Sequence, residues 1–245
     1  MITLSGAEYK AVSQKTIDGL VPELRKHIHW MADDLWIHSP LIVASGLGFF
    51  SAEHFNQAYA RKRSIADKYL GNLRSHARRY LALVEKPYRL EAFLEIRARL
   101  TDAQYWKCLE LVWTMSESLN PEIDTWIELF RSQRRYRPLL MDRKERHAFE
   151  SLPDELTVYR GYQDGEYDHL FGLSWTLSKP QAAWFAHRFD HNGKPTVAKA
   201  RCKRADVFCY LNGRQEQEIV VDPARLTDVQ VLKRTGPSRS KNACQ

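Results

Sequence analysis

The chain has 245 residues, 44% of them hydrophobic and 27% charged, and a formal net charge of +7. These values are typical of a soluble protein with a buried core, and no stretch reaches the roughly 18 consecutive apolar residues of a membrane helix. Residues 1–15 show no basic segment followed by a long apolar core, and the four cysteines have no disulfide-framework spacing. We therefore expect a reduced, cytoplasmic protein without a secretory signal or membrane segment.

The N-terminal part of the chain has a helical pattern. Apolar residues recur there at spacings of three and four, with few glycines between them. The segments that show this pattern are 16–37, 51–84, 88–99, 102–119 and 121–137. We predict a helix over each of them.

Two stretches of this helical part are strongly basic. From Arg61 to Arg89, nine lysines and arginines stand against two acidic residues, and from Arg131 to His147 seven stand against two. Such runs attract polyanions such as nucleic acid, although a solvated helix face has the same composition. The residues predicted to form a nucleic-acid or partner surface are Arg61, Lys62, Arg63, Arg74, Arg78, Arg79, Arg134 and Arg135.

The pattern changes to short β-rich runs after Leu152-Pro153-Asp154. Turn signals such as Asp164-Gly165 and Asn212-Gly213 separate these runs. One helix interrupts them at 181–189, with Ser178 as its N-cap and Pro180 near its start. The predicted strands are 156–160, 171–176, 196–202, 207–211, 216–221 and 229–233.

These patterns predict an α+β protein with a helical N-terminal part and a compact, mainly β C-terminal part. We predict a helical region over 1–90, a second domain over 91–234 with its β core at 152–234, and a flexible tail over 235–245.

Three motifs in the β-rich region carry residues suited to chemistry. In Tyr159-Arg160-Gly161 an arginine at a strand end can bind a diphosphate with planar, paired hydrogen bonds, and the glycine lets the backbone approach a flat ring. In Ser174-Trp175-Thr176 the two hydroxyl groups lie two residues apart, so both face the same side of a strand.

The third motif is Glu216-Gln217-Glu218, which opens a predicted strand. Glutamates at i and i+2 point to one face of a strand, and Ile219 and Val221 point to the other. Carboxylates this close repel each other, so their pairing favours a functional role, while a solvated edge strand is the plain alternative.

In order and spacing the three motifs resemble the arginine–serine–glutamate class of mono-ADP-ribosyltransferases. This class includes the cholera-toxin-like and C3-like toxins and the vertebrate ecto-transferases. The matching motifs span about residues 156–222, well under half of the chain. The resemblance implies a mixed or antiparallel β-sandwich ADP-ribosyltransferase core, and NAD as the substrate that donates ADP-ribose. One departure is Trp175, since this class usually has Ser-Thr-Ser in the second motif.

The resemblance also implies a role for each matching residue. Arg160 would bind the NAD phosphates and Gly161 the nicotinamide amide. Ser174 would orient Glu218, which would stabilise the positive charge that develops on the ribose, and Glu216 would activate the acceptor. Thr176 is a weaker candidate contact. Candidates for an aromatic partner of nicotinamide are Tyr159, Trp184 and Phe185.

The acceptor of ADP-ribose stays open, mainly between two macromolecules, with a small molecule or water as the remaining alternative. A glutamate at the position of Glu216 goes with arginine modification in this class, which favours a protein arginine. The basic runs favour RNA or DNA instead. The soluble, unsecreted character suits an intracellular toxin or defence effector of bacterial or phage type, or one delivered by a dedicated apparatus, with a neutralising antitoxin as a candidate partner.

Two other interpretations compete with a transferase. His187, His191, Cys202 and Cys209 lie close in sequence, but their spacing matches no common structural zinc pattern, so we expect no metal. The other alternative is a non-catalytic nucleic-acid-binding protein that uses the basic helical region and has no need of Glu218.

Overall fold

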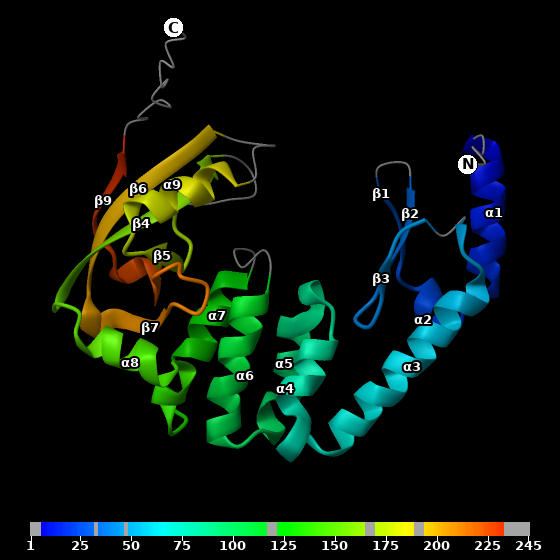
Figure 1. Cartoon of the computed structure of the whole chain (residues 1–245), viewed down its shortest axis with the longest axis horizontal. Coiled ribbons are helices and arrows are strands. Elements are labelled where there is room, and N and C mark those ends of the chain that lie inside the picture. The colour runs from blue at the N-terminus through cyan, green and yellow to red at the C-terminus, as the bar shows by residue number, and fades with distance from the viewer. Residues whose placement is uncertain are drawn as a thin grey trace, which may run out of the picture. The chain divides into compact units, whose positions relative to one another are not determined.

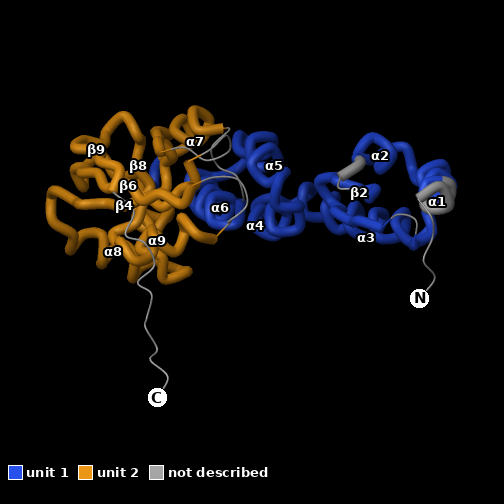
Figure 2. The backbone as a smooth tube through the Cα atoms, turned by 90° about the horizontal axis from the view of Figure 1, so that it is seen from above, with its two compact units in different colours: residues 1–117, 135–137 blue, residues 118–134, 138–245 orange. Residues whose placement is uncertain are grey.

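The computed structural model describes residues 6–31, 34–46, 49–116, 122–164, 170–188 and 194–232. Helices and antiparallel sheets account for 54% and 23% of the structure, so the protein is of the mixed α+β class. The chain divides into two compact units (Figure 2), one over residues 1–117 with 135–137 and the other over 118–134 with 138–245. We call them the N-terminal unit and the C-terminal unit.

The N-terminal unit contains six helices and a small sheet among its described residues (Figure 1). They are α1 (Gly6–Gly19), α2 (Pro22–Arg25), β1 (Ile28–Met31), β2 (Asp34–His38), β3 (Val43–Ala44), α3 (Ala52–Gly71), α4 (Leu73–Leu83), α5 (Arg89–Ile96) and α6 (Asp102–Met115).

The helix predicted over 16–37 is wrong in its second half: α1 and α2 cover 16–19 and 22–25, but strands follow from residue 28. Strands β1 and β2 form an antiparallel hairpin there, and β3 pairs with β2. Along β2 the buried residues alternate, so Leu35 and Ile37 reach a core with Leu24 and Phe55 while their neighbours are less buried. Alternating burial is the strand pattern, and over so short a segment apolar spacing alone does not separate a strand from a helix.

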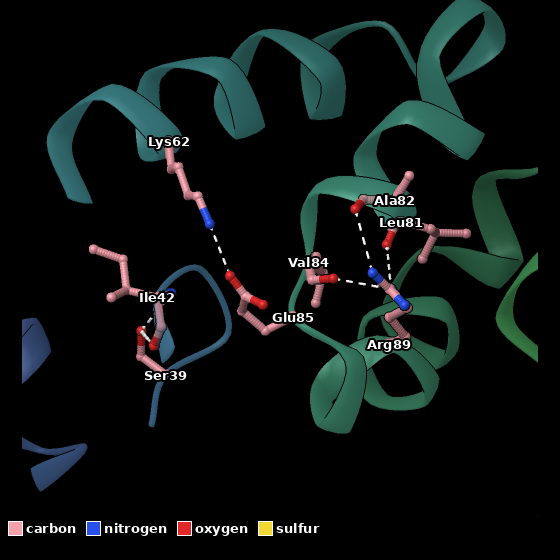
Figure 3. A network of polar contacts seen from close by, with 8 residues as sticks. All are labelled: Ser39, Ile42, Lys62, Leu81, Ala82, Val84, Glu85 and Arg89. Atoms are coloured by element: carbon pink, nitrogen blue, oxygen red, sulfur yellow. Dashed lines mark hydrogen bonds and ion pairs between the residues drawn. The ribbon is translucent and has the colours of Figure 1, made fainter. Parts of the chain in front are cut away.

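The helix predicted over 51–84 is divided in two at Asn72. The Asn72 side chain accepts a hydrogen bond from the Ser75 amide at 3.3 Å, which begins α4 as a new helix. The end of α4 is held by Arg89, whose side chain is buried and donates to the carbonyl oxygens of Leu81, Ala82 and Val84 (Figure 3). Arg89 therefore satisfies helix-terminal carbonyls and contributes no charge to the surface.

Helices α5 and α6 belong to the N-terminal unit, which moves the division of the chain from residue 90 to about 117. Phe93 of α5 packs against Tyr105 of α6, with ring centroids 5.3 Å apart. Gln104 of α6 donates to the carbonyl oxygen of Leu73 in α4 at 3.0 Å.

The C-terminal unit contains three helices and six strands among its described residues. They are α7 (Ile123–Phe130), α8 (Arg143–Glu150), β4 (Glu155–Asp164), β5 (Ser174–Thr176), α9 (Lys179–His187), β6 (Lys194–Lys203), β7 (Val207–Leu211), β8 (Glu218–Val221) and β9 (Thr227–Leu232). Each predicted strand overlaps an observed one; Lys233 and Phe189, at the predicted ends of β9 and α9, lie outside the described residues.

The six strands form one antiparallel sheet in the order β7-β8-β5-β4-β6-β9. Its core residues include Val158, Trp175, Ile219 and Val221, and Phe149 of α8 packs against this cluster. Helix α9 follows β5 directly and lies across β4 and β6 (Figure 1). The Ser178 side chain caps α9 by accepting from the Gln181 amide, as the sequence predicts.

Candidate functional site

Strands β4 and β5 are hydrogen-bonded at a single residue pair, Tyr159 with Thr176. By contrast, β4 pairs with β6 along its whole length. The sheet is therefore nearly divided into two three-stranded halves, β7-β8-β5 and β4-β6-β9. We call the junction of β4 and β5 the seam.

Arg160 occupies the seam. Its Nη1 donates to the Ser174 carbonyl oxygen at 2.8 Å, so the side chain makes a cross-strand bond where backbone pairing has ended. The guanidinium also lies against Gly172, where an added Cβ would be 2.4 Å from Arg160 Nη2. A side chain at position 172 would require the Arg160 guanidinium to shift.

Ser174 connects Arg160 to Glu218. The Ser174 hydroxyl donates to Glu218 Oε1 at 2.6 Å. Strands β5 and β8 are in register here, with Thr176 opposite Glu218. Glu218 is only 5% exposed, and a carboxylate taken this far from water needs hydrogen bonds to remain charged. The structure therefore brings Arg160, Ser174 and Glu218 together, although they are up to 58 residues apart in sequence.

Trp175 points away from the side chains of Ser174 and Glu218. Its side chain is buried in the core with Ile219 and Val221, and its Nε1 donates to the Gly172 carbonyl oxygen at 2.9 Å. Side chains alternate along a strand, so Ser174 and Thr176 lie on the opposite face. The unusual tryptophan in the second motif therefore leaves the face with Ser174 unobstructed by its own ring.

The Thr176 hydroxyl is engaged within the chain. It donates to the Glu216 carbonyl oxygen at 2.6 Å and accepts from the Ser178 amide at 3.0 Å. Thr176 is 4% exposed. These bonds fix the backbone around Glu216 and the start of α9, which is a positioning role.

The expectation that Glu216 and Glu218 share one strand is wrong. Strand β8 begins at Glu218, and Gln215 and Gln217 have φ of 61° and 48°, in the left-handed region. Glu216 therefore lies on a turn before the strand, and strand alternation does not set its direction. Its carboxylate pairs with Arg214, with Nη2 and Oε2 2.8 Å apart.

Gly161 makes room for helix α9. A Cβ on Gly161 would be 1.8 Å from the Ala182 carbonyl oxygen and 2.7 Å from the Ala186 amide nitrogen. Ala182 and Ala186 are fully buried. Helix packing thus accounts for glycine at this position, and contact with nicotinamide stays a prediction.

The three aromatic candidates differ in position. Tyr159 is paired with Thr176 across the seam, and so its side chain lies on the same face of the sheet as those of Thr176 and Ser174. Trp184 is 54% exposed; helical periodicity places it opposite Ala182 and Ala186, away from the sheet. Phe185 is half-buried and contacts the Trp184 ring edge-on at 5.2 Å. The geometry favours Tyr159 and Phe185 over Trp184.

Several residues of the predicted basic surface are paired with acids. Lys62 bonds Glu85 at 2.7 Å (Figure 3), Arg63 bonds Asp67 at 3.0 Å, and Arg78 lies 3.4 Å from Glu110. These pairs reduce the local positive charge. The exposed members of the predicted surface include Arg61, Arg74, Arg79 and Arg135, while Arg134 is half-buried.

The cysteines near the proposed zinc residues are buried in the core. Burial raises the pKa of Cys202 to about 11, and Cys209 is also buried. His187 Nδ1 lies 2.8 Å from the Ala183 carbonyl oxygen of its own helix. No cluster of three or more possible metal ligands occurs among the described residues, and His191 lies outside them.

The N-terminal unit contains a cavity that the sequence does not reveal. Its volume is about 410 Å³, and polar side chains line it, among them Lys26 and His27 just after α2, Tyr88 just before α5, and Glu91 of α5. Burial lowers the pKa of His27 and raises that of Tyr88. The cavity belongs to the helical part of the chain, and none of the residues of the three motifs lines it.

In the part of the chain that the structure describes, no helix is both long and apolar enough to cross a membrane. Comparison with protein families, with curated proteins and with solved structures gave no match to this chain.

Proposed function

We propose that the protein is an NAD-dependent mono-ADP-ribosyltransferase, which transfers ADP-ribose from NAD to a macromolecule and releases nicotinamide. The observation that carries this proposal is the connected arrangement of Arg160, Ser174 and Glu218 at the seam. It holds a cation and a buried carboxylate on either side of one serine. NAD presents matching charges, a negative diphosphate and a ribose that becomes positive as its glycosidic bond breaks.

Each residue has a physical role in this reaction. Arg160 binds the diphosphate, and Ser174 fixes the Glu218 carboxylate by its 2.6 Å hydrogen bond. The bond between the ribose anomeric carbon and the nicotinamide nitrogen breaks, and its electron pair leaves with nicotinamide. Glu218 stabilises the developing positive charge, because a fixed carboxylate in a water-poor site needs no reorganisation. An acceptor nitrogen then bonds to the anomeric carbon and passes its proton to Glu216.

The near division of the sheet supports a transferase core of two sheets. We infer that the halves β7-β8-β5 and β4-β6-β9 of this one sheet are the two layers of the expected sandwich, because only the pair Tyr159–Thr176 joins them. Arg160 and Ser174 flank the seam, and Glu218 on the neighbouring strand β8 accepts from the Ser174 hydroxyl. A site at a junction of two layers is a usual place for a small ligand.

The proposal is tested by NAD cleavage. Purified protein is incubated with NAD and cell lysate, and nicotinamide release is compared with that of Glu218→Gln. We expect release by the natural chain alone. If neither protein consumes NAD in the presence of lysate, the proposal fails.

Arg160→Lys is expected to raise the KM for NAD by about ten- to a hundredfold, because an ammonium cannot reproduce the planar, paired bonds of a guanidinium. Steady-state kinetics over a range of NAD concentrations measures this change. The matched control is Arg201→Lys, an exposed arginine of β6, for which we expect an unchanged KM. Equal KM values for Arg160→Lys and the natural chain would remove Arg160 from the NAD site.

The acceptor stays between a protein arginine and a nucleic-acid base, and the internal pairing of Lys62, Arg63 and Arg78 weakens the second. Incubation of the protein with labelled NAD and cell lysate, followed by digestion with protease or nuclease, decides between these two acceptors. Label removed by protease alone indicates a protein, and label removed by nuclease alone indicates nucleic acid.

We further propose that the protein is an intracellular toxin or defence effector, which an antitoxin neutralises. Expression of the natural chain should then arrest growth, and Glu218→Gln should relieve the arrest.

A further inference from the structure

The turn that carries Glu216 is held from both sides. Within it, the Gln215 amide donates to the Asn212 carbonyl oxygen at 2.9 Å, and the Gln217 amide donates to Asn212 Oδ1 at 3.0 Å. From β5, Thr176 donates to the Glu216 carbonyl oxygen. Left-handed φ at two glutamines is unfavourable, and it persists only where surrounding bonds enforce it. The backbone of Glu216 is therefore fixed.

Arg214 and Glu216 form an ion pair with unequal partners. Arg214 Nη2 lies 2.8 Å from Glu216 Oε2, and the Arg214 side chain is 53% exposed whereas that of Glu216 is 14% exposed. The more exposed partner can exchange with a cation from solvent, while the backbone that carries Glu216 stays in place. Removal of Arg214 from the pair exposes a carboxylate next to the strand that carries Glu218.

We propose that Arg214 occupies the place of the acceptor on Glu216. It keeps this carboxylate from accepting a proton until the cation of an acceptor displaces it. This inference rests on the proposed transferase function. Glu216 can accept a proton from the acceptor nitrogen only when its carboxylate faces that nitrogen. While Arg214 is bound, the competent fraction of the protein is reduced, and the apparent affinity for the acceptor falls by the same factor.

The chemistry of Arg214 also determines which acceptor competes best for the Glu216 carboxylate. A guanidinium matches the carboxylate in charge and in planar geometry, so a second guanidinium replaces Arg214 without loss of the bond. A neutral exocyclic amine of a nucleic-acid base would leave the carboxylate without a cation. Arg214 therefore selects for an arginine-like acceptor and against a neutral one.

The test uses the full chain, NAD and agmatine as a small guanidine acceptor, with Arg214→Gln and, as a matched control, Arg225→Gln at another exposed arginine of the C-terminal unit. We expect Arg214→Gln to lower the KM for agmatine about two- to fivefold, the range that fits an exposed ion pair. The KM for NAD and the rate of NAD hydrolysis without agmatine stay unchanged. Arg225→Gln changes none of these quantities.

Three results would overturn the inference: an unchanged or higher KM for agmatine in Arg214→Gln, a parallel change in NAD hydrolysis, or label from NAD on nucleic acid but not on agmatine. In each of these cases NAD is still cleaved, so the transferase proposal survives. Failure of every protein to release nicotinamide would instead overturn the transferase proposal, and this inference with it.

Discussion

Replacement of Glu218 by glutamine is expected to lower the rate of nicotinamide release about a hundredfold or more, because the variant loses the negative charge that stabilises the ribose cation. Glutamine has nearly the same size and keeps an oxygen that can accept from the Ser174 hydroxyl, now 2.6 Å from the carboxylate. The KM for NAD should change little, since the carboxylate acts mainly in the transition state.

The stability of the same variant should not fall. Glu218 is 5% exposed, and burial of a carboxylate costs free energy that a neutral amide avoids in large part. We therefore expect a melting temperature equal to that of the natural chain or higher. Loss of turnover without loss of stability is the pattern of a residue kept for function.

Steady-state rates and thermal unfolding measure the two effects. Glu150→Gln, at an exposed position in α8, is the matched control for a lost carboxylate. A Glu218→Gln protein that turns over NAD at the natural rate contradicts the assignment. A variant that is inactive and also unfolds at a much lower temperature would show that Glu218 serves the fold.

The parts of the site that the sequence predicts are those fixed by local signals. Ser178 caps α9, as its position before a Pro-containing helix start indicates. Trp175 faces the core because strand alternation requires it to oppose Ser174. Such features depend on residues only a few positions apart, and short-range geometry determines them.

Other features depend on contacts between distant segments, and the sequence does not predict them. The hairpin at 28–38 is buried against α3, whose Phe55 shares its core, so apolar spacing within the segment misleads. Glu216 leaves the strand because Gln217, which is not a glycine, adopts a left-handed φ. The pairing of Glu216 with Arg214 depends on that turn, so the sequence does not predict this ion pair either.

Gly161 is the clearest case of a residue whose observed surroundings differ from those that its motif suggests. The sequence motif assigns it to the approach of a flat ring, whereas the structure fills the space above it with the backbone of α9. In the sheet Gly161 is opposite Val197 of β6, and contact of its peptide groups with nicotinamide stays a prediction. The helix contact gives Gly161 a role in stability that can be measured without NAD.

Gly161→Ala is expected to destabilise the C-terminal unit by about 3 kcal/mol or more, the upper range for overpacking of a filled interior. The new Cβ would lie 1.8 Å from the Ala182 carbonyl oxygen and 2.7 Å from the Ala186 amide nitrogen. Both are backbone atoms of one helix, so no side-chain rotation relieves the overlap. Helix α9 must move away from β4, and the Thr176–Ser178 connection at its start moves with it.

Urea denaturation measures the loss of stability, and hydrogen exchange followed by mass spectrometry locates it. We expect faster amide exchange in α9 and unchanged exchange in α3 and α4 of the N-terminal unit. Gly213→Ala is the matched control, because an added Cβ there meets no atom within 4 Å and should change stability by less than about 0.5 kcal/mol. If Gly161→Ala matches this control in stability and in α9 exchange, then α9 does not pack on the sheet at Gly161, and the positions of Thr176 and Glu216, which depend on that packing, lose their support.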